Sequence, residues 1–87
     1  MKRYVIEGTW SGYRSSQSRV CHRQVVEKWK ADAIAKITAI QFTDGTTMDL
    51  IVRPCTFREK VKEINGYGDL LYRAIGKSGF VNVMDIK

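Results

Sequence analysis

The stretch Ala39–Val52, AIQFTDGTTMDLIV, carries the clearest structural signal in the sequence. Two segments that alternate apolar and polar residues flank the dipeptide Asp44-Gly45, an arrangement typical of a β-hairpin. A two-residue loop made by this dipeptide would set Ile40 against the polar face of the second strand. A three-residue loop ending at Gly45 pairs Ile40 with Met48 instead, so that the apolar side chains share one face. We therefore predict the three-residue loop, with Gly45 left-handed in a β-bulge.

The N-terminal part of the chain predicts another hairpin, with an unusually long loop. Residues 4–10 and 19–27 alternate as β-strands do, and the second segment is rich in β-branched residues. Residues 11–18 between them contain a glycine and four serines, which favours a polar loop. Strict alternation along the second strand places Arg19 and Arg23 on the same face.

Three further segments have helical patterns. Residues 29–38 contain three alanines and an apolar stripe with helical spacing. Residues 56–64 begin with a capping box, and residues 67–76 combine an apolar stripe with an acidic first turn. Pro54 ends the strand that precedes residues 56–64, because proline has no N–H to donate to the ladder of the sheet. Residues 80–86 fit either a short strand or a short helix.

Together these segments predict one α+β domain that spans residues 1–87. The expected architecture is an antiparallel β-sheet built from two hairpins, with two or three short helices packed on one face. The hydrophobic share of 44% and the charged share of 28% are typical of a folded protein and argue against disorder. A chain of 87 residues buries only a modest core, so we also expect a homo-oligomer.

The charge balance favours an anionic partner. Lys and Arg number 15 and Asp and Glu number 9, which gives a net charge of +6. Acidic residues are absent from Thr9 to Val26, the segment that holds the long loop. Such an excess suits phosphates or carboxylates, although a basic balance also serves simply to keep soluble proteins apart.

Several kinds of chemistry find no support. Cys21 and Cys55 form no CxxC pair, and a single histidine completes no metal-ligand set. No nucleophile elbow or paired-carboxylate motif is visible, so we expect neither an enzyme nor a metal or cofactor. The sequence has no signal-peptide pattern and no apolar run long enough to cross a bilayer, which predicts a cytoplasmic protein without a membrane partner.

Candidate binding residues cluster in the first hairpin and its loop. Aromatic rings stack on nucleobases, arginine forks bind phosphates, and serine hydroxyls with turn amides enclose anionic oxygens. In the alternative interpretation, the aromatic residues cap the core and the serines form a solvated loop. The lone histidine suits a ligand donor better than a general base, and one tyrosine lies between two glycines that permit close approach of a ligand. The predicted ligand-binding residues are Trp10, Tyr13, Arg14, Arg19, His22, Arg23 and Tyr67.

Several of these segments resemble a known family. Residues 3–20, RYVIEGTWSGYRSSQSRV, with His22-Arg23, residues 42–46 (FTDGT) and residues 64–67 (INGY), resemble the first-described (Tad-one) family of phage-encoded Thoeris anti-defence sponges. The resemblance implies a protein that captures cyclic ADP-ribose isomers in the host cytoplasm and does not cleave them. It also implies a homo-oligomer, dimer or hexamer, and a capacity in some members to bind the cyclic oligonucleotides of CBASS defence.

Two other classes fit the same composition. A small basic nucleic-acid-binding domain would use the same charge excess and exposed aromatic residues, and its binding would weaken steeply with salt. A protein inhibitor that docks on a host enzyme through a basic face is the third hypothesis.

Overall fold

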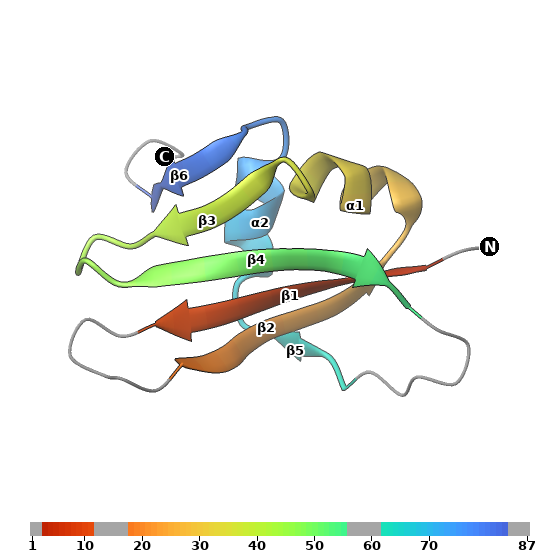
Figure 1. Cartoon of the computed structure of the whole chain (residues 1–87), viewed down its shortest axis with the longest axis horizontal. Coiled ribbons are helices and arrows are strands. Elements are labelled where there is room, and N and C mark those ends of the chain that lie inside the picture. Colours follow the sequence, from red (N-terminus) through yellow and green to blue (C-terminus); the bar gives the residue numbers. More distant parts are fainter. Residues whose placement is uncertain (1–2, 12–17, 56–61, 84–87) are drawn as a thin grey trace.

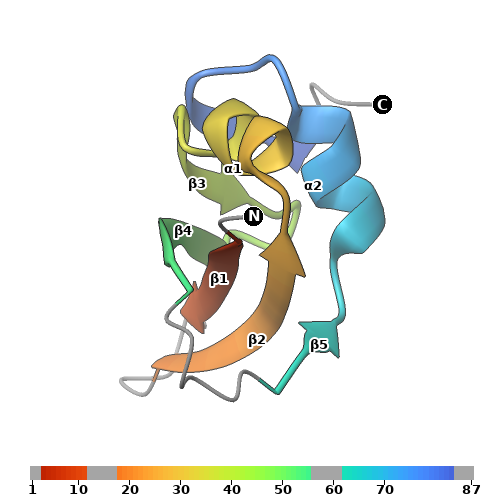
Figure 2. The ribbon, with the colours of Figure 1, turned by 90° about the vertical axis from the view of Figure 1, so that its right-hand side faces the viewer.

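The computed structural model of this chain describes residues 3–11, 18–55 and 62–83. The strands are β1 (Tyr4–Ser11), β2 (Ser18–Val26), β3 (Ile37–Gln41), β4 (Thr47–Pro54), β5 (Ile64–Asn65) and β6 (Gly79–Asn82), and the helices are α1 (Lys28–Ile34) and α2 (Gly68–Ala74). The strands form one six-stranded sheet in the order β5-β2-β1-β4-β3-β6. Figures 1 and 2 show both helices on the same side of this sheet. The predicted α+β class is confirmed.

The hairpin of β3 and β4 has the predicted register and loop. Ile40 lies opposite Met48, as expected for a three-residue loop. The Phe42 N–H donates to the Thr46 carbonyl at 2.8 Å, and the Gly45 N–H donates back to the Phe42 carbonyl at 3.1 Å. Gly45 has a φ of 89°, the left-handed conformation that glycine adopts without steric cost.

The hairpin of β1 and β2 contains a β-bulge that the sequence did not reveal. Gly8 lies opposite His22, but the next residue, Thr9, lies opposite Val20. Cys21 is therefore an extra residue on β2, and the alternation of faces along this strand changes there.

The bulge separates the two arginines of β2. Arg19 lies opposite Trp10, whereas Arg23 lies opposite Glu7. Because Glu7 and Trp10 point to opposite faces of β1, their partners do as well. The expectation that Arg19 and Arg23 share one face is wrong, since it assumed strict alternation through Cys21.

The helix expected over residues 29–38 is shorter than predicted. Helix α1 ends at Ile34, and a turn leads into β3, which begins at Ile37. Ile37 is buried, but as a strand residue. The Gly79 N–H donates to the Lys36 carbonyl at 2.7 Å and ties this turn to β6. Pairing within the sheet overrides the local helix signal here, and the β-branched side chain of Ile37 favours the extended backbone.

The two later helix predictions have different outcomes. The helix expected over residues 56–64 is wrong at its C-terminal end, because Ile64 belongs to β5 and pairs with Arg23; residues 56–61 lie outside the described residues. The helix expected over residues 67–76 is confirmed as α2. It stops at Ala74, since the next residue is extended and the following Gly76 has a φ of 93°.

Strand β6 makes the sheet mixed rather than purely antiparallel. It runs parallel to β3, with Val81 beside Ile40, whereas the other strand pairs are antiparallel. The chain reaches β6 only after β4, β5 and α2, so no hairpin imposes the antiparallel direction. Residues 79–82 thus resolve the ambiguity of residues 80–86 in favour of a strand, and residues 84–86 lie outside the described part.

The core lies between the sheet and the two helices. One buried cluster joins side chains from the inner face of the sheet with the apolar stripes of both helices; its members include Ile6, Ile40, Met48 and Leu50 of the sheet, Ala31 and Ile34 of α1, and Leu71 and Ala74 of α2. Gly8 makes room for this packing, because a Cβ at that position would lie 2.6 Å from the Met48 sulfur.

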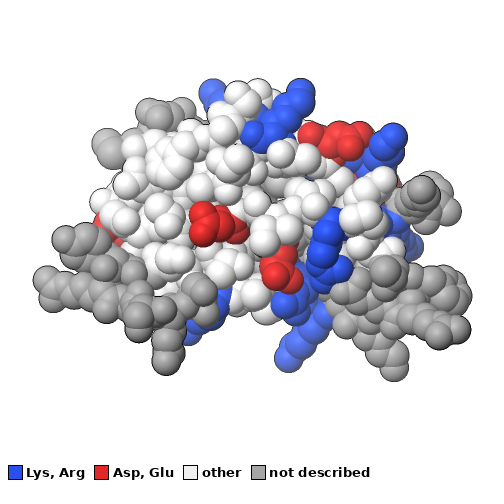
Figure 3. All heavy atoms as spheres, in the orientation of Figure 1, with Lys and Arg blue, Asp and Glu red and all other residues white. Residues whose placement is uncertain are grey.

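No helix of the described residues covers the opposite face of the sheet. Ile51 of β4 and Phe80 of β6 are 54% and 56% exposed there, while the neighbouring residue Leu50 is buried. Figure 3 looks onto this face and shows a broad uncharged area with acidic groups near its middle. An antiparallel sheet commonly has one packed face and one face toward solvent.

Candidate functional site

Trp10 and Arg19 form the part of the predicted site that the structure brings together. They lie opposite each other at the loop end of the first hairpin. The guanidinium carbon of Arg19 lies over the Trp10 indole, 5.5 Å from the ring centroid, which is within the range of cation–π attraction. Trp10 is half-buried and Arg19 is exposed, so the pair offers a ring and a cation to solvent.

The loop that follows this pair holds two further predicted residues. Tyr13 and Arg14 belong to residues 12–17, which lie outside the described residues. Ser11, the last residue of β1, pairs with Ser18, the first residue of β2, directly beside the Trp10–Arg19 pair.

Arg23 lies apart from this pair, on the other face of the sheet. Its Nε donates to Oε2 of Glu7 at 2.9 Å, in a partly buried cross-strand ion pair. The charge of Arg23 is therefore compensated by Glu7, and its side chain does not face the same ligand as Arg19.

His22 is fully buried and acts as an internal hydrogen-bond acceptor. Its Nδ1 accepts the backbone N–H of Tyr67 at 3.2 Å, which leaves the proton on Nε2. That Nε2 and Oε1 of Gln24 are buried without a hydrogen-bond partner among the described residues. Burial lowers the pKa of His22 below its ordinary value of 6.5, and the Gln24 side chain opposes this shift. Burial thus favours the neutral form of His22, and the protein interior encloses its side chain.

Tyr67 is half-buried at the start of α2. Its ring packs against Phe42 with centroids 5.3 Å apart and a tilt of 47°. The adjacent Gly66 allows the chain to approach β2, because a Cβ there would lie 2.9 Å from the Cys21 carbonyl oxygen. Gly66, Tyr67 and Gly68 also line a small pocket of about 280 Å³, and the approach of a ligand to Tyr67 stays a prediction.

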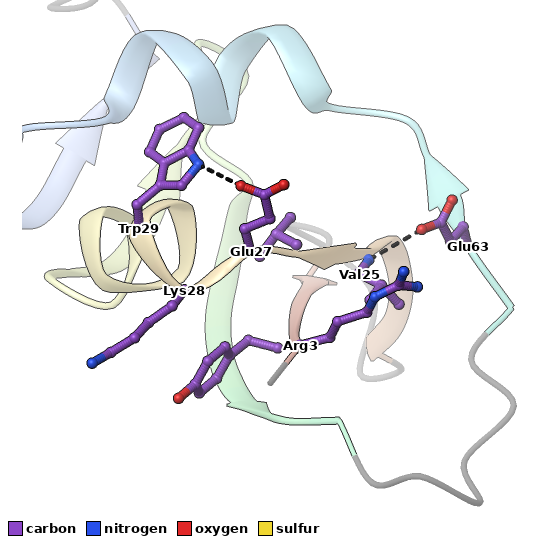
Figure 4. Close-up of a pocket in the computed structure, with 8 residues that line it drawn as sticks. Arg3, Val25, Glu27, Lys28, Trp29 and Glu63 are labelled. Carbon is purple, nitrogen blue, oxygen red and sulfur yellow. Dashed lines mark hydrogen bonds between the residues drawn. The ribbon is translucent and has the colours of Figure 1, made fainter. Parts of the chain in front are cut away.

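A cavity lies at the other end of the first hairpin, away from Trp10 and Arg19. Its volume is about 630 Å³, and it is lined by Arg3 and Tyr4, by residues 25–29, and by Glu63 (Figure 4). The sequence did not indicate this cavity, because its walls come from three separate segments. The sequence patterns predict a strand that ends at Glu27 and a helix that begins at Trp29, and neither pattern marks these residues as the wall of a cavity.

The remaining polar groups support no metal centre in the described part of the chain. No group of three or more His, Cys, Asp or Glu side chains lies close enough there to hold an ion. Cys21 and Cys55 form no disulfide bond, and burial raises the pKa of the Cys21 thiol, which disfavours the reactive thiolate. No helix within the described residues has the length and apolar character that a membrane span requires. Comparison with known family models, curated proteins and solved structures finds no match to this chain.

Proposed function

We propose that this protein binds an anionic, ring-containing small molecule at the loop end of the first hairpin and sequesters it without cleavage. The proposed ligand is a cyclic nucleotide signal of the cyclic ADP-ribose type, with cyclic oligonucleotides as further candidates. The observation that carries the proposal is the position of the Arg19 guanidinium over the Trp10 ring.

The chemistry of this pair suits such a ligand. An indole stacks on a nucleobase, and a guanidinium donates paired hydrogen bonds to a phosphate. Contact with the ring orients Arg19, which lowers the entropy lost when it binds an anion. The adjacent loop adds Tyr13 and Arg14 in sequence, and the net charge of +6 attracts phosphate-bearing molecules.

Sequestration without chemistry agrees with the state of the lone histidine. His22 is fully buried, and its Nδ1 is occupied by the Tyr67 N–H. A general base must reach the proton that it abstracts, and this imidazole has no such access.

The proposal extends to assembly and compartment. A homo-oligomer, dimer or hexamer, in the cytoplasm of a host cell would suit a small protein that must outcompete a signalling receptor for its ligand. Native mass spectrometry of protein purified from cells with active nucleotide signalling measures the subunit number and any retained nucleotide together.

Calorimetric titration with cyclic ADP-ribose isomers tests the binding site. We expect Trp10→Ala and Arg19→Gln each to weaken binding by about tenfold or more, because stacking and a charged hydrogen bond are each worth about 1–3 kcal/mol. Arg73→Gln, which removes an exposed arginine from α2, is the matched control and should bind normally.

Two outcomes of this experiment contradict the proposal. One is a wild-type protein that binds none of these nucleotides or that releases a cleaved product after denaturation. The other is tight binding of single-stranded DNA or RNA with a steep loss of affinity at high salt, which would favour the nucleic-acid-binding domain instead.

A further inference from the structure

We propose that the cavity at the far end of the first hairpin binds a small zwitterion with an aromatic body, such as a free aromatic amino acid. This cavity lies beside Tyr4 and Val26, whereas Trp10 and Arg19 lie at the opposite end of the same two strands. The site is therefore separate from the proposed nucleotide site, and each can be tested without the other.

Two carboxylates of the cavity are held in place by neutral donors. The Trp29 indole N–H donates to Oε2 of Glu27 at 3.0 Å, and the Val25 backbone N–H donates to Oε1 of Glu63 at 3.2 Å (Figure 4). These bonds orient the carboxylates but do not cancel their charge. Each carboxylate keeps a second oxygen that can accept a hydrogen bond from an ammonium group.

Two cations among the described lining residues complete the charge pattern of the cavity. Arg3 and Lys28 line it together with Glu27 and Glu63, and none of the four forms an ion pair with another described residue. Among the described lining residues, two positive and two negative charges sum to zero. A phosphate-bearing polyanion would face both carboxylates, so the pattern favours a guest that carries one charge of each sign.

The arrangement of the charges places the head group of the guest. Figure 4 shows Arg3 extending toward Val25 and Glu63 at one end of the cavity, with Glu27 and Trp29 at the other. The guest's carboxylate would bind the Arg3 guanidinium, and its ammonium would bind the second oxygen of Glu63. Its side chain would then extend toward Trp29.

The remaining walls suit an aromatic side chain. Trp29 is 60% exposed, and its indole is held by Glu27, so it offers a ring face in a fixed orientation. Tyr4 and Val26 supply further apolar surface. The volume of about 630 Å³ lies within the range of about 300–1,000 Å³ that is usual for small-molecule sites.

An NMR titration of the full-length ¹⁵N-labelled protein with L-phenylalanine tests the proposal. We expect saturable shifts of the amide signals of residues 25–29 and of the Trp29 indole, and no shift of Trp10. Phenethylamine, which lacks the carboxylate, and 3-phenylpropionate, which lacks the ammonium, should each bind about tenfold more weakly, because each loses one charge-assisted hydrogen bond.

Two substitutions of exposed residues assign the head-group contacts. Glu63→Gln keeps an oxygen for the Val25 N–H but removes the charge, and Arg3→Gln removes the guanidinium. Each should weaken L-phenylalanine binding by about tenfold. The matched controls Asp49→Asn and Arg73→Gln change exposed charges that do not line the cavity, and they should bind as the wild type does.

Three results would overturn this assignment. They are the absence of saturable shifts at residues 25–29 with millimolar L-phenylalanine, equal binding of either singly charged analogue, and unchanged affinity in both Glu63→Gln and Arg3→Gln. Because the readout is the shift of these signals and not nucleotide binding, failure here leaves the Trp10–Arg19 site untouched.

Discussion

Arg19 and Arg23 belong to the same strand but have opposite surroundings. The extra residue Cys21 places Arg19 over the Trp10 ring, while Arg23 stays with Glu7 on the other face. A cation that is paired with a carboxylate has less attraction for an anionic ligand than an exposed one. The difference between the two arginines therefore determines which of them can serve the proposed site.

The buried side chain of His22 makes the stability of the protein depend on pH. Its pKa lies below the ordinary value of 6.5 in the folded state, chiefly because of burial, with Lys30 adding to the shift and Gln24 and Glu63 opposing it. Protonation of Nδ1 would also turn this atom into a donor, so that it could no longer accept the hydrogen bond from the Tyr67 N–H. The unfolded chain therefore binds the proton more readily than the folded protein does.

The stability of the protein should consequently fall as the pH decreases below about 6.5. The contribution of His22 is complete above that pH, and it is lost progressively toward the lower pKa of the folded state. Urea unfolding measured between about pH 7 and pH 5 checks this. His22→Gln, which does not titrate, removes the sole histidine and should show a flatter profile. A slope that is the same in both proteins would contradict the prediction.

The hairpin of β3 and β4 shows how a short element determines its own geometry. The Asp44 carboxylate accepts hydrogen bonds from both the backbone N–H and the hydroxyl of Thr46, at 3.0 and 2.6 Å. Together with the left-handed Gly45, these bonds define the loop from within five consecutive residues. The register of the two strands follows from the loop.

Gly45→Ala should destabilise the protein by about 1–2 kcal/mol, because a Cβ is strained at a φ of 89°. Asparagine tolerates the left-handed conformation, so Gly45→Asn should cost less. Chemical denaturation of both variants measures the difference. Equal stability of the alanine and asparagine variants would show that the conformation of this residue does not control the loop.

At the scale of the whole molecule, the two helices of the described residues lie on the same face of the sheet. Leu50 and Ile51 are consecutive on β4, yet Leu50 is buried beneath the helices and Ile51 is 54% exposed. Side chains alternate across a strand, so Leu50 and Ile51 point to opposite faces of the sheet. Two residues of similar size and hydrophobicity therefore differ strongly in how much of their surface is buried.

Leu50→Ala should therefore cost about 2–5 kcal/mol, and Ile51→Thr about 0.5 kcal/mol or less. Thermal and urea unfolding of the native protein, measured for both variants at the same protein concentration, checks these two values. A comparable loss of stability at Ile51 would mean that another layer of protein covers the open face.

The sequence predicted the polar composition of the first loop and the two residues that meet at its base, Trp10 and Arg19. It did not predict the fate of Arg23, since a bulge leaves no mark in the alternation of a short strand. It gave no indication of the cavity between Arg3, Trp29 and Glu63 either. Residues that line a cavity need only be close in space, and nothing in their sequence spacing records that closeness.

Local interactions explain what could be read along the chain. The hairpin at Gly45, the α2 helix and the apolar stripes depend on residues a few positions apart, so their patterns are visible in the sequence. The end of α1 at Ile34, the strand at Ile64 and the parallel direction of β6 depend on partners distant in the chain, and the packed structure overrides weak local preferences there. Side-chain burial and backbone pairing between distant segments therefore decided the final architecture and the location of both proposed sites.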